Sequence, residues 1–173
     1  MSSKITPAVI EDIPELVSLV NSAYRGEASK KGWTTEADLL DGIRTDEASL
    51  YIILNKPAAV ILKYLNEENE IAGCVYLEKN NDELYLGMLS VLPEEQAQGI
   101  GKQLMKASED YAQDYKLKAV VITVISVRTE LIAWYERRGY KQTGQIKPFA
   151  EDKRSGVPTQ PLQFIIMKKL LKQ

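Results

Sequence analysis

The clearest pattern in the chain is a change from an apolar run to helical spacing between residues 84 and 115. Residues 84–91 form a mostly apolar run of strand length. Residues 102–115 then place a set of side chains at helical spacing, namely Leu104, Met105, Ser108, Tyr111, Ala112 and Tyr115. Residues 91–102 lie between these two patterns and include Gly99 and Gly101. The pattern predicts a strand, a glycine loop and a helix.

The N-terminal part predicts a short strand followed by helices. Residues 5–10 suit a strand, and Pro7 places it at a sheet edge or lies at the beginning of the strand. A helix is predicted from the turn signals at residues 11–14, with an apolar stripe of Ile13, Leu16, Val17, Val20 and Tyr24. Residues 21–32 are interpreted as a loop. Thr34 or Thr35 can cap a second helix, with Glu36 in its first turn and Leu39, Leu40 and Ile43 on its buried side.

Three further strands are predicted before the glycine loop. They are residues 50–54 or 58–65, then 71–78, then 84–91, joined by polar turns short enough for antiparallel hairpins. After the loop helix, residues 119–124 predict a strand parallel to residues 84–91, because a helix joins the two. A helix ending near Tyr140 follows, and residues 141–144 and 164–167 complete the sheet. The fold class is therefore mixed α/β, with antiparallel N-terminal strands, a central parallel pair and helices on both faces.

Composition restricts the classes of function. The chain of 173 residues has a formal net charge of −2, which argues against a general nucleic-acid or anionic-membrane surface. It contains no histidine, so His-ligated metals and Ser-His or Cys-His catalysis are excluded, and we expect no metal site. Its one cysteine, Cys74, lies in an apolar run and is interpreted as a core residue. Apolar runs are too short to span a membrane, and we expect a single cytoplasmic domain over residues 1–173.

The glycine loop has the properties of an anion site. The first N–H groups of a helix have no partner inside the helix, so a loop that opens a helix favours an anion. No Asp or Glu occurs between Gln96 and Ser108, whereas Lys102 and Lys106 do. The spacing does not fit a Walker loop, because Gln103 follows Lys102. A dinucleotide-binding loop would need a glycine at Leu104.

The pattern Gln-x-x-Gly-x-Gly after an apolar strand resembles the coenzyme A loop of the GCN5-related N-acetyltransferase (GNAT) family. Gln96, Gly99 and Gly101 match the positions of that motif, and Gln98 stands where the family often has Arg or Lys. The resemblance implies that the loop holds the pyrophosphate of acetyl-coenzyme A. The implied loop contacts are Gln96, Ala97, Gln98, Gly99, Ile100, Gly101 and Lys102.

A second stretch resembles the same family. Tyr135 lies four residues before Gly139-Tyr140, and the family has a tyrosine at this distance from Gly-Phe or Gly-Tyr. Where the family often carries Asn and Ala upstream of this tyrosine, the chain has Arg128 and Leu131, and Arg128 is assigned to the coenzyme site. The two signatures occur in the family's order, and the resemblance covers nearly the whole chain.

The resemblance implies a GNAT-like sheet in which the two central parallel strands splay apart. The pantetheine arm would lie in the gap and bond backbone groups of Leu89, Ser90 and Val91. These groups would also polarise the thioester carbonyl, as an oxyanion site does.

The implied chemistry is direct attack by an amine in a ternary complex, since the chain offers no plausible nucleophile. The resemblance places Tyr135 beside the coenzyme sulfur as the general acid, and a packing role for its ring is the alternative. The family's glutamate base falls at Tyr85, so Glu83 and Glu78 are the other candidates, with a water relay or a low-pKa amine as alternatives. For the acceptor, the family uses the regions that correspond to residues 21–34 and 145–161, with Tyr24, Glu27, Trp33 and Phe149 as candidates.

Together these patterns predict an acetyl-coenzyme A-dependent N-acetyltransferase that acts on a small-molecule or peptide amine. The alternative is a coenzyme A-binding sensor without catalysis. No nucleic-acid or membrane partner is expected. The identity of the acceptor and the oligomeric state, including a homodimer, are left open.

Overall fold

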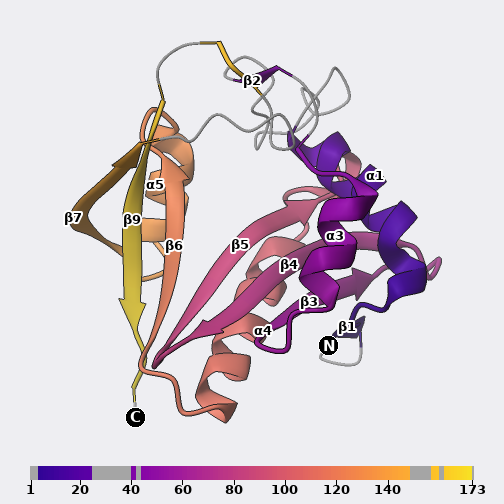
Figure 1. Cartoon of the computed structure of the whole chain (residues 1–173), viewed down its shortest axis with the longest axis horizontal. Coiled ribbons are helices and arrows are strands. Elements are labelled where there is room, and N and C mark those ends of the chain that lie inside the picture. Colours follow the sequence, from indigo (N-terminus) through magenta and orange to yellow (C-terminus); the bar gives the residue numbers. More distant parts are fainter. Residues whose placement is uncertain (1–3, 25–39, 42–43, 149–156, 160–161, 173) are drawn as a thin grey trace.

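A computed structural model describes residues 4–24, 40–41, 44–148, 157–159 and 162–172 of the chain. Its main element is a seven-stranded sheet in the order β1-β3-β4-β5-β6-β9-β7. A separate pair of short strands, β2 and β8, lies beyond one end of that sheet (Figure 1). The predicted fold class is confirmed. No helix within the described ranges is long and apolar enough to cross a membrane.

The predicted strand at residues 5–10 is shorter in the structure, because residue 10 already belongs to a 3-10 turn, whereas the helix that follows buries most of its predicted apolar stripe. Strand β1 (Ile5–Pro7) lies at the sheet edge, where the missing N–H of a proline costs least. A 3-10 turn, η2 (Ile10–Asp12), leads into helix α1 (Ile13–Tyr24). The predicted loop at residues 21–32 is corrected at its start, because the helix continues to Tyr24. Residues 25–32 lie outside the described ranges.

The apolar run at residues 50–54 forms a helix, so the first of the two alternative strands was wrong. Helix α3 (Glu47–Leu54) begins at Asp46, whose carboxylate accepts a hydrogen bond from the Ser49 N–H at 2.7 Å. The second alternative was right, since strand β3 covers Ala59–Leu65. The short run did not distinguish helix from strand, whereas the acidic cap before it favours the helix.

The helix predicted from Thr34 or Thr35 falls mostly outside the described residues, including Glu36, Leu39 and Ile43. Its end is corrected, because Leu40–Asp41 form strand β2 and pair antiparallel with strand β8 (Val157–Pro158). These two strands are more than a hundred residues apart in the sequence, and no local pattern indicates such a pairing.

The antiparallel half of the sheet consists of β1, β3, β4 (Ile71–Asn80) and β5 (Glu83–Val91), joined by the predicted hairpins. The register between β4 and β5 shifts between Cys74 and Tyr76. Opposite this shift, Met88 has a φ of 54°, which marks a bulge in β5. Leu84 and Leu86 face one core cluster while Met88 faces the other, and Leu89 returns to the first. The bulge therefore resets the direction of the residues near the end of β5.

The predicted parallel pair is confirmed as β5 and β6 (Ala119–Ile125), connected through helix α4 (Ile100–Asp114). Only three residue pairs join the two strands, from Glu83 with Ala119 to Tyr85 with Val121. Beyond them the strands diverge, and Figure 1 shows the widening gap between β5 and β6.

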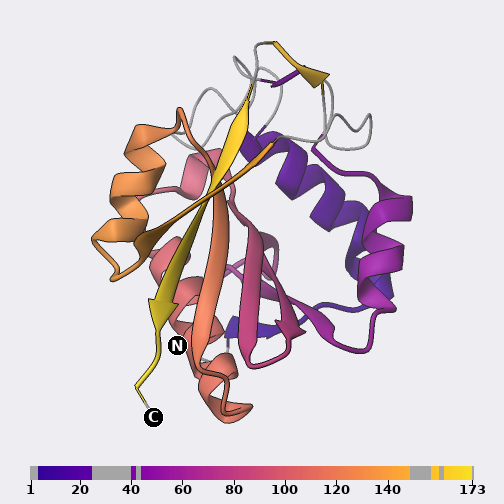
Figure 2. The ribbon, with the colours of Figure 1, turned by 60° about the vertical axis from the view of Figure 1, so that its left-hand side comes forward.

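Helices cover both faces of the sheet (Figure 2). Helices α1 and α3 pack on one core, which includes Leu16, Leu50 and Cys74. Helices α4 and α5 (Thr129–Glu136) pack on the other, which includes Leu104, Ile132 and Tyr135. Cys74 is fully buried, as predicted, and burial raises the pKa of its thiol to about 12.

The C-terminal strands extend beyond their predicted ranges. Strand β7 (Lys141–Pro148) pairs with β9 (Gln163–Leu170), and β9 pairs with β6. The predicted loop at residues 145–161 is therefore corrected, since residues 145–148 belong to β7 and residues 157–158 to β8. Residues 149–156 and 160–161 lie outside the described ranges.

Candidate active site

A cavity of about 210 Å³ lies where β5 diverges from β6. It joins four elements that are distant in the sequence: the end of α1, the end of β5, the glycine loop and helix α5. Its lining residues are Tyr24, Leu89, Val91, Glu95, Gln96, Ala97, Gly99, Ile100, Gly101, Lys102, Leu131, Trp134 and Tyr135. We call this space the coenzyme cavity. Most of the residues predicted for the loop therefore meet the predicted acid, Tyr135.

The glycine loop reaches α4 through two residues with left-handed backbone. A 3-10 turn, η3 (Pro93–Glu95), precedes Ala97 with φ 68° and Gly99 with φ 83°. Gly99 is the N-cap of α4, whose first turn holds no acidic residue. The helix dipole and the unpaired first N–H groups therefore favour an anion at this end of the cavity.

The two glycines have different roles. A Cβ at Gly99 would meet nothing within 4 Å, so its left-handed backbone is what requires glycine. Gly101 has no such backbone, and a Cβ there would lie 3.6 Å from Cζ2 of Trp134 in ordinary contact. Both glycines line the cavity, and of the two only Gly99 has a backbone conformation that requires glycine.

The open edge of β5 presents backbone carbonyls to the cavity. The Leu92 N–H donates to the Ala72 carbonyl of β4 at 2.9 Å, so the preceding carbonyl, that of Val91, points the other way. Nε2 of Gln96 donates to this carbonyl at 3.1 Å. Two residues earlier, the hydroxyl of Tyr24 donates to the carbonyl of Leu89. Each carbonyl has a second lone pair, so both can accept a further bond.

Tyr135 lies at the wall of this cavity and is 6% exposed. Its ring packs edge-on against Trp134 and Tyr140, with centroids at 5.2 and 5.8 Å. Burial raises the pKa of its hydroxyl, as do the neighbouring Tyr24 and Tyr85, while Arg128 and Arg138 act against this shift. The hydroxyl is therefore protonated at neutral pH and can donate a proton.

Three of the residues predicted to bind the coenzyme, Ser90, Gln98 and Arg128, are not among the residues that line the cavity. The Ser90 hydroxyl is buried and donates to the Met88 carbonyl at 3.0 Å, so the side chain stabilises the bulge. Gln98 is exposed and does not line the cavity. Arg128 is the N-cap of α5 and lies close enough to Tyr135 to affect its pKa.

The structure does not bring the three base candidates to the cavity lining. Glu83 begins β5, about 26 Å from Val91 at ~3.3 Å per residue, and pairs with Lys168 at 2.5 Å. Glu78 accepts a hydrogen bond from the Tyr76 hydroxyl, and its Oε1 lies 3.6 Å from Nζ of Lys56. Tyr85 lies opposite Glu78, and its ring covers Gly87.

Among the acceptor candidates, only Tyr24 lies in the described part of the chain, and it lines the cavity. Glu27, Trp33 and Phe149 lie outside the described residues.

Sequence reasoning missed Glu95, Leu131 and Trp134, which also line the cavity. Leu131 and Trp134 precede Tyr135 by four residues and one residue, so helical spacing could have placed Leu131 on the same face. Within the described ranges, no three His, Cys, Asp or Glu side chains gather as a metal site.

A protein-family model described as "Acetyltransferase (GNAT) family" matches residues 14–140. Human N-acetyltransferase 8B is 27% identical over 123 residues, which are 68% of this chain and 53% of that protein. The chain thus spans about half the length of this curated relative.

Solved structures show the same fold. The ribosomal-protein-S18-alanine N-acetyltransferase from Escherichia coli superposes with a TM-score of 0.73 at 16% identity, covering 98% of this chain and 94% of that one. A Bacillus anthracis protein assigned as a streptothricin acetyltransferase, solved in complex with acetyl coenzyme A, gives a TM-score of 0.58 at 20% identity. That match covers 70% of this chain and 67% of the other. At these identities the likeness concerns the fold alone.

Proposed function

The chain belongs to the acetyltransferase (GNAT) family, and from this premise we propose that it transfers the acetyl group of acetyl-coenzyme A to a primary amine. On this proposal residues 1–173 act as one acetyltransferase domain. One observation carries the proposal. The diverging strands, the glycine loop at the start of α4 and the buried Tyr135 all meet in one cavity.

The residues of the cavity fit the parts of the coenzyme. The N-terminus of α4, with Gly99, Gly101 and Lys102, suits a diphosphate because its N–H groups and charge are complementary. The carbonyls of Leu89 and Val91 suit the amide N–H groups of a pantetheine arm lying along β5. We therefore assign the arm to the gap between β5 and β6, where it takes the place of a neighbouring strand.

The chemistry needs a neutral amine, a stabilised oxyanion and a proton for the departing thiolate. Tyr135 is assigned to the last task, because its buried hydroxyl keeps its proton at neutral pH. Backbone N–H groups at the end of β5 are assigned to the oxyanion. Burial of the Cys74 thiol, which holds its proton, agrees with direct attack rather than an acetyl-cysteine intermediate.

Removal of the amine proton is assigned to solvent rather than to a side chain. A lysine-like amine with a pKa near 10.4 costs about 4.6 kcal/mol to deprotonate at pH 7, and an α-amine near 7.8 costs about 1 kcal/mol. Glu78 and Glu83 are each in an ion pair away from the cavity, which argues against a direct role. The arrangement therefore favours an acceptor whose amine has a lowered pKa, or a water relay.

Tyr24 is assigned to the acceptor side of the cavity. Its ring lies at the end of α1, and its hydroxyl reaches across to the Leu89 carbonyl on β5. It also affects the pKa of Tyr135, so the two hydroxyls are near each other. An amine that enters past Tyr24 would therefore approach the thioester from the side opposite the glycine loop.

The test has two parts. Calorimetry first measures acetyl-coenzyme A binding, for which a micromolar dissociation constant is expected. Release of free thiol is then followed with a pooled library of primary amines. Binding with acceptor-dependent thiol release supports the enzyme. Binding without release for any amine would support a coenzyme A-binding sensor, and the absence of binding would reject both functions.

A further inference from the structure

A second hollow lies directly beside the coenzyme cavity. It has a volume of about 530 Å³ and is open to solvent on one side. Lys102, Lys106 and Glu109 of α4 line it, with Arg137 and Arg138 after α5 and Lys169 of β9. We call these six side chains the cationic basin. Five of them are cations in a chain whose net charge is −2, so the basin concentrates positive charge locally.

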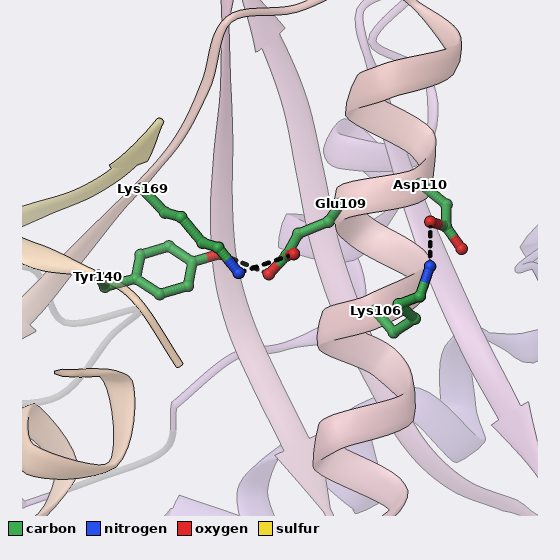
Figure 3. A network of polar contacts seen from close by, with 5 residues as sticks. All are labelled: Lys106, Glu109, Asp110, Tyr140 and Lys169. Carbon is green, nitrogen blue, oxygen red and sulfur yellow. Dashed lines mark hydrogen bonds and ion pairs between the residues drawn. The ribbon is translucent and has the colours of Figure 1, made fainter. Parts of the chain in front are cut away.

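Within the described residues, carboxylates pair with two of these five cations, Lys106 and Lys169 (Figure 3). Nζ of Lys169 lies 3.0 Å from Glu109, and the Tyr140 hydroxyl lies 3.5 Å from the same carboxylate. Both side chains of this ion pair are mostly buried, and both line the basin. Lys106 pairs with Asp110 at 2.6 Å, but both side chains are largely exposed, so solvent competes with the pair. Lys106 can therefore exchange Asp110 for another anion at little cost.

The two arginines lie close enough for their charges to interact, and neither forms an ion pair with a carboxylate of the described residues. Arg138 is held by the indole of Trp134, 3.6 Å from its guanidinium carbon, and by the Trp134 carbonyl at 2.7 Å. Its Nε is buried and donates to no group in the described part of the chain. Burial lowers the pKa of Arg138, and so does the positive charge of Arg137. An anion in the basin would offset this repulsion.

The basin begins at the last residue of the glycine loop and extends one helical turn beyond it. Lys106 follows Lys102 by four residues, which is about 6 Å along α4 at ~1.5 Å per residue. Lys102 lines both the coenzyme cavity and the basin, so the two spaces adjoin at this side chain. Coenzyme A carries a phosphate monoester at the 3′ position of the ribose whose 5′ position carries the diphosphate. With the diphosphate at the start of α4, this monoester comes within reach of the basin.

We propose that the cationic basin binds the 3′-phosphate of the coenzyme, so that the protein distinguishes coenzyme A from its 3′-dephospho form. Lys106 and Arg137 are the groups that contact this phosphate, while Arg138 and Lys169 shape the basin. The inference rests on the proposed function, because it needs the diphosphate at the glycine loop. It adds that coenzyme recognition extends beyond the loop to α5 and β9.

The test compares two ligands with two proteins by calorimetry. Coenzyme A and 3′-dephospho-coenzyme A are titrated into the parent protein and into the variant Lys106→Gln/Arg137→Gln. We expect the parent to bind coenzyme A at least about tenfold more tightly, because hydrogen bonds to charged groups have this strength. In the variant this preference should fall to about twofold, while affinity for the dephospho form stays within twofold of the parent.

Lys118→Gln is the matched control, because it removes one positive charge beyond the far end of α4. It should leave the preference unchanged, and thermal unfolding should show that all variants fold. Equal affinity of the parent for the two coenzymes would overturn the inference and leave the proposed function standing. A preference that survives in the double variant would also overturn it. If neither coenzyme A nor dephospho-coenzyme A bound to the parent, the inference and the proposed function would both be overturned.

A free phosphate ion is the other source of the same chemistry. Titration of the parent with coenzyme A and with dephospho-coenzyme A, each in 10 mM inorganic phosphate as a chosen probe concentration, distinguishes the two sources. If the site serves the coenzyme, phosphate weakens coenzyme A binding and leaves dephospho-coenzyme A binding within twofold. If phosphate instead strengthens dephospho-coenzyme A binding to the level of coenzyme A, the basin is a separate phosphate site and the inference fails.

Discussion

At its first three residues strand β5 is paired on both sides, to β4 and to β6, whereas from Leu86 onward it is paired only to β4. In the paired end, Glu83 binds Lys168 and the backbone groups are used within the sheet. In the open end, the carbonyls of Leu89 and Val91 are bonded by the side chains of Tyr24 and Gln96. Side-chain bonds are easier to exchange than a strand ladder. The comparison indicates that chemistry belongs to the open end and stability to the paired end.

The largest effect is expected from Tyr135, the acid proposed for the open end. Tyr135→Phe removes the hydroxyl and keeps the ring, so packing against Trp134 and Tyr140 is retained. We expect kcat to fall about 10- to 10³-fold, with acetyl-coenzyme A affinity within twofold, because the lost contact is made in the transition state. Steady-state kinetics and calorimetry measure the two values.

Tyr140→Phe is the control, since Tyr140 is equally buried but its hydroxyl contacts Glu109 outside the coenzyme cavity. It should leave kcat within about twofold. A Tyr135→Phe variant that turned over at the parent rate would show that Tyr135 only packs, and the proton would then come from water.

The pH dependence of the rate sharpens the same assignment. Burial raises the pKa of Tyr135 above its ordinary value of 10.0, so the protonated acid is present at all lower pH values. The Tyr135 hydroxyl would lose its proton, and with it its role as an acid, only as the pH rises through the raised pKa. We therefore expect kcat to show no decline from pH 8 to 10, in contrast to an acid with an ordinary tyrosine pKa. A decline in this range that is absent in Tyr135→Phe would contradict the raised pKa.

The next largest effect is expected at Gly101 of the glycine loop, on the affinity for coenzyme A. Gly101→Ala places a methyl group 3.6 Å from Trp134, an ordinary contact, on the wall of the coenzyme cavity. We expect the free protein to unfold at nearly the same temperature. The dissociation constant for coenzyme A should rise about tenfold, because the methyl group keeps the diphosphate from one N–H. If affinity stayed within twofold, the diphosphate would not lie against Gly101.

A smaller effect is expected from the hydroxyl that bonds the Leu89 carbonyl. Tyr24→Phe removes one neutral hydrogen bond, worth about 1 kcal/mol or a factor of about 5. If Tyr24 faces the acceptor, the KM of the acceptor should rise by about this factor while acetyl-coenzyme A affinity stays the same. If the KM of the acceptor rose and acetyl-coenzyme A affinity fell by the same factor, Tyr24 would have a structural role. If only the coenzyme affinity fell, Tyr24 would contact the pantetheine arm.

The sequence predicted the paired end and the loop well, because both depend on local patterns. The apolar runs gave β4, β5 and β6, and the helix between them gave the parallel pair. It did not predict the bulge at Met88 or the Tyr24 bond to Leu89, which joins residues 65 positions apart. It also did not separate helix from strand at residues 50–54, where the run was too short to show a period.

In the candidate site, too, local motifs were informative, whereas contacts between distant segments were missed. Most loop residues of the first motif and Tyr135 of the second came together in the cavity, since each motif sets a local geometry. The base candidates were chosen by counting along strands, and counting does not show which strand end opens into a cavity. Glu95 lies one residue before the motif and was therefore not assigned to the site. The cationic basin gathers side chains from separate elements, which a single sequence does not align.

The smallest effect is expected at the paired end, from Glu83. Glu83→Gln removes the ion pair with Lys168, whose two side chains are each about one-third exposed. Such partly exposed pairs contribute about 0–1 kcal/mol, so chemical denaturation should show a loss of at most that size. Since Glu83 is about 26 Å along β5 from Val91, kcat should stay within twofold at every pH from 6 to 9. A large loss of kcat throughout this pH range, with stability retained, would make Glu83 the general base. It would also show that the paired end of β5 takes part in the chemistry, against the division drawn between the two ends.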